Sequence, residues 1–195
     1  MEKEVIKNDN RILIIGGSAG SLEALLYFLP QVKKDIPLSI IIVLHRKTDA
    51  ESMLTNLLQS RTSIPVREIE DKEKILPSMI YIAPANYHVL IEKEGIFSLD
   101  VSEKINYSRP SIDVSFETAA DVYGANATAL LLSGANADGV AGLKRIKTAG
   151  GKAIIQKPSS AEVSYMPQQA LNEIEPDAVL TNEEIADYIN SSFKF

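Results

Sequence analysis

The stretch Arg11-Ile-Leu-Ile-Ile15, followed directly by Gly16-Gly-Ser-Ala-Gly20, decides the fold class. The first part is a short apolar run rich in β-branched residues, which is typical of a strand buried on both faces of a sheet. The glycines end that strand, and leucines then recur at the spacing of one helix face. We expect Ser21 to cap this helix. The pattern predicts a strand, a sharp turn and a helix.

The same alternation of strand and helix recurs along the chain. A second apolar run, Leu38 to Leu44, is followed by a helical pattern over residues 50–61. Later segments continue it as predicted strands at 127–132, 152–156 and 178–180 and predicted helices at 138–149, 167–172 and 182–191. Strands that alternate with helices indicate a parallel sheet covered on both faces.

The middle of the chain has a different pattern. Short apolar runs separated by turn residues predict a patch of partly antiparallel strands at 65–69, 79–83, 87–91 and 97–101. A helix over 111–123 follows, with Pro110 in its first turn. The sequence therefore predicts one α/β domain over residues 11–195, doubly wound and mostly parallel, with a small antiparallel β excursion. Residues 1–10 are predicted to be a flexible lead-in.

Composition excludes several classes of protein. The 195 residues include no cysteine, so disulfides, thiolate metal sites and a cysteine nucleophile are excluded. The net charge is −6 and no cluster of lysine and arginine occurs, so we expect no nucleic-acid partner. The start of the chain lacks a signal peptide pattern, and no apolar run is long enough to span a membrane. We expect a cytoplasmic protein with no direct membrane insertion.

Three side chains that support hydrolysis follow three of the predicted buried strands. Ser18 follows the first strand, His45 follows the second, and Asp138 lies beyond the strand at 127–132. Ligands of open parallel sheets bind beyond the carboxyl ends of the strands, so these side chains share the functional edge. A serine needs a base to remove its proton, and an aspartate can orient the histidine that acts as this base. Free N–H groups at the start of the following helix favour a developing negative charge.

Other interpretations compete with each of these residues. Glycine-rich turns between a strand and a helix often bind phosphate, although both nucleotide fingerprints are missing here. A lone histidine after a strand is commonly a surface residue, and Asp138 by itself fits a cap of the helix that it begins. The order serine, histidine, aspartate also differs from the order in α/β-hydrolases. The common placement of all three residues is what favours a hydrolase.

Several motifs occur together in a recognisable order. They are Ile15-Gly-Gly-Ser-Ala-Gly-Ser21, Ile42-Val-Leu-His45, Leu76-Pro-Ser-Met-Ile-Tyr-Ile-Ala-Pro84, Arg109-Pro-Ser-Ile-Asp-Val-Ser-Phe116, Leu132-Ser-Gly-Ala-Asn-Ala-Asp-Gly139 and Tyr165-Met-Pro167. With these motifs the chain resembles the catalytic domain of the CheB family, the protein-glutamate methylesterases of bacterial chemotaxis. The resemblance runs from about Arg11 to about Asn190.

The resemblance implies a serine hydrolase with Ser18 as nucleophile, His45 as general base and Asp138 as the residue that orients it. It implies methyl esters of chemoreceptor glutamates as substrates, deamidation of receptor glutamines as a second activity, and no metal or organic cofactor. The partners would be methyl-accepting chemotaxis receptors, through their cytoplasmic region. Ala19 and Ala135 are candidate backbone donors to the oxyanion, and Arg109 is a candidate substrate contact.

The sequence departs from the family pattern in two places. The loop before Asp138 usually reads Gly-Met-Gly in the family, whereas here it carries Ala135 and Asn136. We expect Asn136 to adopt a left-handed conformation, which asparagine tolerates. Only ten residues precede the first predicted strand, so we expect a stand-alone domain with no receiver domain before it.

Two alternatives to the methylesterase stay open at this point. One is a non-catalytic module that binds receptors, and the other is an esterase or amidase that acts on another substrate. Of the two histidines, His88 lies in the predicted β excursion, where we expect it to be structural rather than catalytic.

Overall fold

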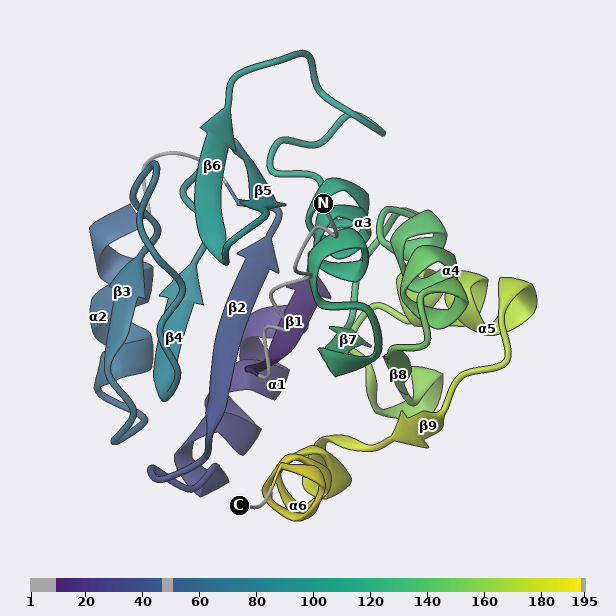
Figure 1. Ribbon diagram of the computed structural model, residues 1–195. Helices are drawn as coiled ribbons and strands as arrows, with labels where there is room; N and C mark the ends of the chain where they lie inside the picture. Colours follow the sequence, from purple (N-terminus) through teal and green to yellow (C-terminus); the bar gives the residue numbers. More distant parts are fainter. Residues whose placement is uncertain (1–9, 47–50, 194–195) are drawn as a thin grey trace.

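The computed structural model describes residues 10–46 and 51–193 and contains a parallel sheet of seven strands. Its strand order is β3-β4-β2-β1-β7-β8-β9 (Figure 1). The strands are β1 (Arg11–Gly17), β2 (Leu38–Leu44), β3 (Val66–Glu68), β4 (Met79–Ile82), β7 (Ala127–Leu131), β8 (Lys152–Gln156) and β9 (Ala178–Leu180). A separate antiparallel pair consists of β5 (His88–Glu92) and β6 (Ile96–Asp100).

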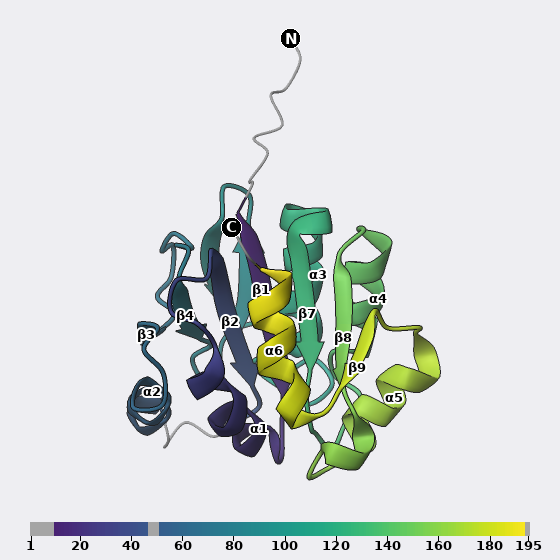
Figure 2. The same cartoon turned by 90° about the horizontal axis from the view of Figure 1, so that it is seen from below.

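Helices cover both faces of the parallel sheet (Figure 2). One face carries α1 (Ser21–Phe28), α2 (Glu51–Gln59) and α6 (Asn182–Ser192). The other face carries α3 (Ile112–Tyr123), α4 (Val140–Thr148), α5 (Tyr165–Glu173) and the β5–β6 pair. Along β1 the isoleucines at 12 and 14 point to one core, and Leu13 and Ile15 point to the other. A strand between two helix layers needs apolar residues at every position, which explains the continuous apolar runs.

The predicted fold class is confirmed, but the predicted β patch is only half right. β3 and β4 join the main sheet in parallel, and only β5 and β6 are antiparallel. In β4, Ile80 and Ile82 pack in one core and Tyr81 in the other, so the strand is buried on both faces. A strand of four residues is too short for its sequence to reveal this double burial.

Two helix starts differ from their predicted positions. The helix α1 begins at Ser21 after Gly20, which has a φ of 78° and holds the N-cap position. Ser21 is therefore not the cap, and its hydroxyl donates to the Ser18 carbonyl at 2.5 Å. The helix α3 begins at Ile112 with Ser111 as its N-cap, so Pro110 lies just outside the helix. Residues 1–9 of the predicted lead-in fall outside the described residues.

The order of the strands creates a crevice at the centre of the sheet. The central strand β1 pairs with β2 on one side and with β7 on the other. Chain connections diverge to opposite sides of β1, which defines a topological switch point beyond its carboxyl end. Ser18, His45 and the loop at 133–139 all lie at this edge. In residues 10–46 and 51–193, no helix has both the length and the apolar character that a bilayer crossing requires.

Close packing of α3 against α4 depends on Gly142. A Cβ atom at this position would lie 2.5 Å from the Phe116 Cβ and 3.1 Å from the Asp113 carbonyl oxygen. We expect Gly142→Ala to lower the free energy of unfolding by about 1–3 kcal/mol, because the added methyl group forces the helices apart. Urea unfolding measures this loss. Ala141→Ser, at the exposed neighbouring position, is the control and should stay within about 0.5 kcal/mol of the parent; equal losses would contradict the packing argument.

Candidate active site

Backbone hydrogen bonds tie the loops of the switch point together. The Ser18 N–H donates to the Ser133 carbonyl at 2.9 Å, which joins the turn after β1 to the loop after β7. The His45 N–H donates to the Gly17 carbonyl at 3.1 Å, which joins the end of β2 to the same turn. Three segments far apart in the sequence therefore hold Ser18 and His45 at one edge of the sheet.

Ser18 and His45 line one cavity of about 450 Å³. The wall also contains Gly20, Ser21 and Arg46, and its apolar part is formed by Leu22, Leu44, Met53, Leu54 and Leu57. Within residues 10–46 and 51–193 no hydrogen bond joins the Ser18 hydroxyl to the His45 ring. The structure thus brings the two side chains to one cavity, whose apolar lining suits a substrate with an apolar portion.

His45 is paired with Asp138. The ring Nε2 lies 2.7 Å from Oδ2 of Asp138, which is fully buried. A carboxylate only accepts hydrogen bonds, so Nε2 carries the proton and Nδ1 keeps a free lone pair. The hydroxyl of Ser108 lies 3.5 Å from Nδ1. His45 is therefore held in the tautomer that can accept a proton at Nδ1.

Asp138 lies at the amino terminus of α3. Its carboxylate accepts the N–H groups of Ile112 at 2.7 Å and Asp113 at 3.0 Å, and the hydroxyl of Ser111 at 3.1 Å. Burial alone would raise the pKa of Asp138, but the hydrogen bonds from His45, Ile112 and Asp113 outweigh it and hold the pKa below its usual value. Asp138 does not cap its own helix, whose N-cap is Gly139. It stays ionised next to His45 instead.

Asp113 makes the reciprocal contact to α4. Its Oδ1 accepts the Gly142 N–H in the first turn of α4 at 2.7 Å. Burial raises the pKa of Asp113 to about 6 with a contribution from the negative charge of Asp138, although the Gly142 N–H opposes the shift. Asp113 in α3 thus holds the start of α4, and Asp138 in the loop before α4 holds the start of α3.

The loop before Asp138 closes without a left-handed asparagine. Asn136 is not among the residues with positive φ, so the predicted left-handed conformation is wrong. Its side-chain oxygen accepts the Asp138 N–H at 3.0 Å, and the positive φ of 97° belongs to Gly139. An asparagine that bonds its own backbone two residues on closes a turn by itself.

Ser133, which the sequence did not single out, organises both sides of the crevice. It is fully buried, its hydroxyl donates to the Ala19 carbonyl at 2.7 Å, and it accepts the Val163 N–H at 2.8 Å. Ser111 and Asp113 were also missed as site residues, although both lie in the quoted Arg109-to-Phe116 motif. Only that motif signals their role, because their contacts join separate helices.

The remaining predicted residues, Ala19, Ala135 and Arg109, are not among the described residues that line the cavity. Ala19 and Ala135 are exposed, and within residues 10–46 and 51–193 their N–H groups have no hydrogen-bond acceptor. The Arg109 Nη1 donates to the carbonyls of Val101 and Ser102, each at 2.7 Å. The structure therefore shows Arg109 holding the loop beyond β6, and its contact with substrate stays a prediction.

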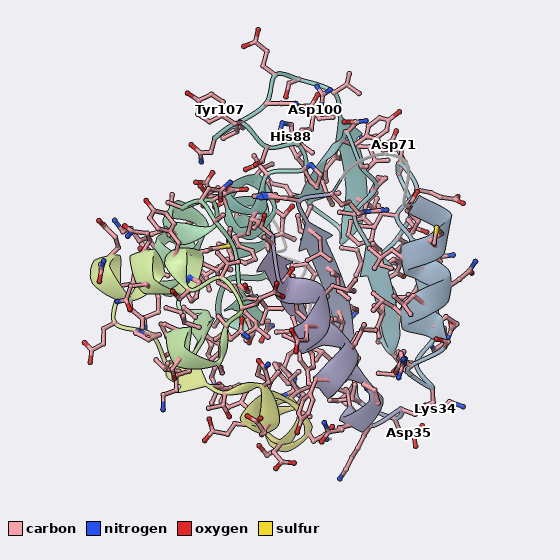
Figure 3. The ribbon with its side chains drawn as sticks, turned by 180° about the vertical axis from the view of Figure 1, so that it is seen from behind. Lys34, Asp35, Asp71, His88, Asp100 and Tyr107 are labelled. Atoms are coloured by element: carbon pink, nitrogen blue, oxygen red, sulfur yellow. The ribbon has the colours of Figure 1, made fainter. Side chains whose placement is uncertain are left out.

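His88 is part of the framework. Its side chain is buried, its Nε2 lies 2.9 Å from the Glu103 carbonyl, and its Nδ1 accepts the Ser111 N–H at 3.1 Å. His88 pairs with Asp100 across β5 and β6, and Figure 3 shows both at the end of the molecule opposite Lys34 and Asp35. Both ring nitrogens are used by backbone groups, in agreement with the structural role predicted for His88.

The fold and the residues at its switch point define the class, which is a doubly wound α/β domain with the residue set of a serine hydrolase. The sequence matches the CheB methylesterase family over residues 13–189. A crystal structure of the Thermotoga maritima CheB methylesterase catalytic domain has a TM-score of 0.90 and 31% identity, and the match covers 94% of this chain and 98% of that domain. The chain therefore belongs to the CheB methylesterase family.

Two relatives illustrate the range of similar proteins. A Leptospira interrogans protein named putative protein-glutamate methylesterase/protein-glutamine glutaminase is 42% identical, over 90% of this chain and 91% of its own length. The Thermotoga maritima protein-glutamate methylesterase/protein-glutamine glutaminase is 32% identical over 91% of this chain. The match spans 52% of that protein, so this chain corresponds to about half of it.

The tautomer of His45 depends on the charge of Asp138. In Asp138→Asn, an amide N–H replaces the acceptor that faces Nε2, so the proton moves to Nδ1 and the base is lost. We expect kcat for ester hydrolysis to fall by roughly 10³–10⁴-fold, with ¹⁵N NMR of His45 reporting the change of tautomer. Ser111→Ala removes one hydrogen bond from Asp138 but keeps the carboxylate, so its loss should be much smaller. An unchanged tautomer in Asp138→Asn would contradict the assignment.

The raised pKa of Asp113 makes a testable contribution to stability. The folded chain binds this proton more tightly than the unfolded chain, so the contribution of Asp113 to the free energy of unfolding falls as pH rises from about 4 to about 6, and is constant above that. Asp113→Asn keeps an acceptor for Gly142 but removes this slope. Urea unfolding across this pH range measures it. Asp121→Asn, an exposed change on the same helix, is the control and should keep the parent's pH dependence. If Asp113→Asn also kept the parent's pH dependence, the assignment to Asp113 would be wrong.

Proposed function

We propose that this chain is a protein-glutamate methylesterase that hydrolyses glutamate methyl esters of chemoreceptors through Ser18, His45 and Asp138. The observation that carries the proposal is the buried His45–Asp138 pair beside the cavity that Ser18 lines, in a chain of the CheB methylesterase family. Similar proteins are named for this activity and for deamidation of protein glutamines.

The first chemical step forms an acyl-enzyme. His45 Nδ1 accepts the proton of the Ser18 hydroxyl while the oxygen attacks the ester carbonyl, and the positive charge on the ring is stabilised by the ionised Asp138. The carbonyl oxygen becomes negative and binds to free backbone N–H groups, for which Ala19 and Ala135 are the candidates. The C–O bond to the methoxy group then breaks, and His45 gives its proton to the leaving oxygen, so that methanol is released.

The second step reverses the roles of the groups. A water molecule gives a proton to His45 Nδ1 and attacks the acyl carbon. The bond to Ser18 breaks, Ser18 regains its proton from His45, and the glutamic acid product leaves and loses its own proton to water. With a glutamine substrate, ammonia takes the place of methanol and the same groups act in the same order.

The proposed substrate indicates where in the cell the enzyme would act. The methylated glutamates would belong to the cytoplasmic region of methyl-accepting chemotaxis receptors, so the enzyme would act in the cytoplasm. Arg109 anchors a loop next to Ser108, whose hydroxyl lies near His45 Nδ1. A substrate contact by Arg109 would therefore be made at the rim of the site.

Methanol release from a methylated receptor fragment tests both the reaction and the nucleophile. The parent should release methanol, and Ser18→Ala should release about 10³-fold less or none, because no other group in the turn forms the acyl bond. Ser108→Ala is the matched control, since it removes the serine hydroxyl that lies 3.5 Å from His45 Nδ1. It should retain most of the release.

Other results would contradict either the assignment of the nucleophile or the proposed activity. Loss in Ser108→Ala with retention in Ser18→Ala would assign the nucleophile to Ser108. Absence of methanol release by the folded parent would contradict the proposed activity and favour a non-catalytic receptor-binding module or a different ester. Ammonia release from the matching glutamine fragment measures deamidation in the same assay.

A further inference from the structure

We propose that Arg46 binds the substrate, with its Nε and Nη1 donating hydrogen bonds to an oxygen acceptor beside the scissile ester. This inference rests on the proposed function and adds a residue that determines specificity at the same site. Arg46 follows His45 directly in the chain and lines the cavity that Ser18 and His45 also line. A substrate bound in that cavity can therefore contact Arg46 and the Ser18–His45 pair at the same time.

One nitrogen of the guanidinium group is firmly anchored. Nη2 donates to Oε2 of Glu68 and to the carbonyl of Ala83, both at 3.0 Å. Glu68 ends β3 and Ala83 follows β4, so the anchor joins the carboxyl ends of three neighbouring strands. Only 9% of the Arg46 side chain is exposed. The anchor fixes the plane of the guanidinium at the cavity wall.

The other nitrogens are unused. Nε and Nη1 are buried, and neither has a hydrogen-bond partner in the part of the chain that the structure describes. Nearly all buried donors in folded proteins are paired, because an unpaired donor loses its hydrogen bonds to water without compensation. The loss is greater for a charged group. An arginine that only joined the strands would not need to keep two donors unpaired in the wall of a cavity that Ser18 also lines.

The cavity indicates the chemistry of the partner. Among the lining residues that the structure describes, Arg46 is the one charged side chain apart from any charge on His45, and the wall beside it is mostly apolar. Guanidinium N–H groups bind carbonyl and carboxylate oxygens. The acceptor would be either a peptide carbonyl or a carboxylate of the substrate segment that carries the ester. Met53 is 72% exposed at this wall, and its flexible side chain can move to admit the substrate.

Kinetics with a methylated receptor fragment separate this role from a structural one. Arg46→Met should raise KM by about tenfold or more with a smaller effect on kcat, because a charge-assisted bond to bound substrate is lost. Arg46→Lys should not restore KM, since a lysine presents one nitrogen in place of the planar group. Arg67→Met is the matched control, because it removes another arginine–glutamate pair that does not line the cavity.

Two versions of the receptor fragment, with and without its acidic residues, identify the oxygen that accepts the hydrogen bonds of Arg46. If replacing its acidic residues by amides abolishes the difference between the parent and Arg46→Met, the acceptor is a carboxylate; a persisting difference identifies a peptide carbonyl. Equal KM values for the parent and Arg46→Met with both fragments would overturn the proposal. Binding of labelled fragment to Ser18→Ala, with and without Arg46→Met, tests the contact without catalysis. A loss of binding in the double variant would support it even if the parent released no methanol.

Discussion

The site depends on one buried carboxylate. Asp138 accepts two backbone N–H groups from the first turn of α3 and lies 2.7 Å from His45 Nε2. A helix amino terminus stabilises negative charge, so the carboxylate stays ionised although water does not reach it. The same bonds fix the position of α3 and the orientation of the imidazole. The hydrogen bonds that position α3 therefore also orient the catalytic base.

Close approach of α3 to the sheet is what makes these bonds possible. A Cβ atom on Gly16 would lie 2.4 Å from Ile112 Cγ2, and a Cβ atom on Gly139 would lie 2.9 Å from the same atom. The first residue of α3 thus packs directly on the carboxyl-terminal end of β1 and on the N-cap of α4. Glycines that ended a strand in the sequence are also the contacts that admit the helix.

The sequence could predict the fold and the three catalytic candidates for a simple physical reason. Strands between two helix layers are apolar throughout, and ligands bind beyond their carboxyl ends, so the strand pattern also placed Ser18, His45 and Asp138. The edge strand β3 and its neighbour β4 were assigned to the wrong sheet because runs of three and four residues carry no clear period. Pairing of β4 with β2 depends on contacts that only the folded chain makes.

The hydrogen bonds that hold the site residues in place were less predictable, since they join elements that lie far apart in the sequence. Asp113 holds the start of α4 while Asp138 holds the start of α3, and neither contact has a signature in the residues next to it in the chain. At Asn136 the sequence predicted a feature that the structure does not have. The departure from glycine suggested a strained backbone, yet the asparagine side chain accepts the Asp138 N–H and Gly139 takes the left-handed conformation. The substitution therefore supplies a turn contact that glycine lacks, and Asp138 keeps its place.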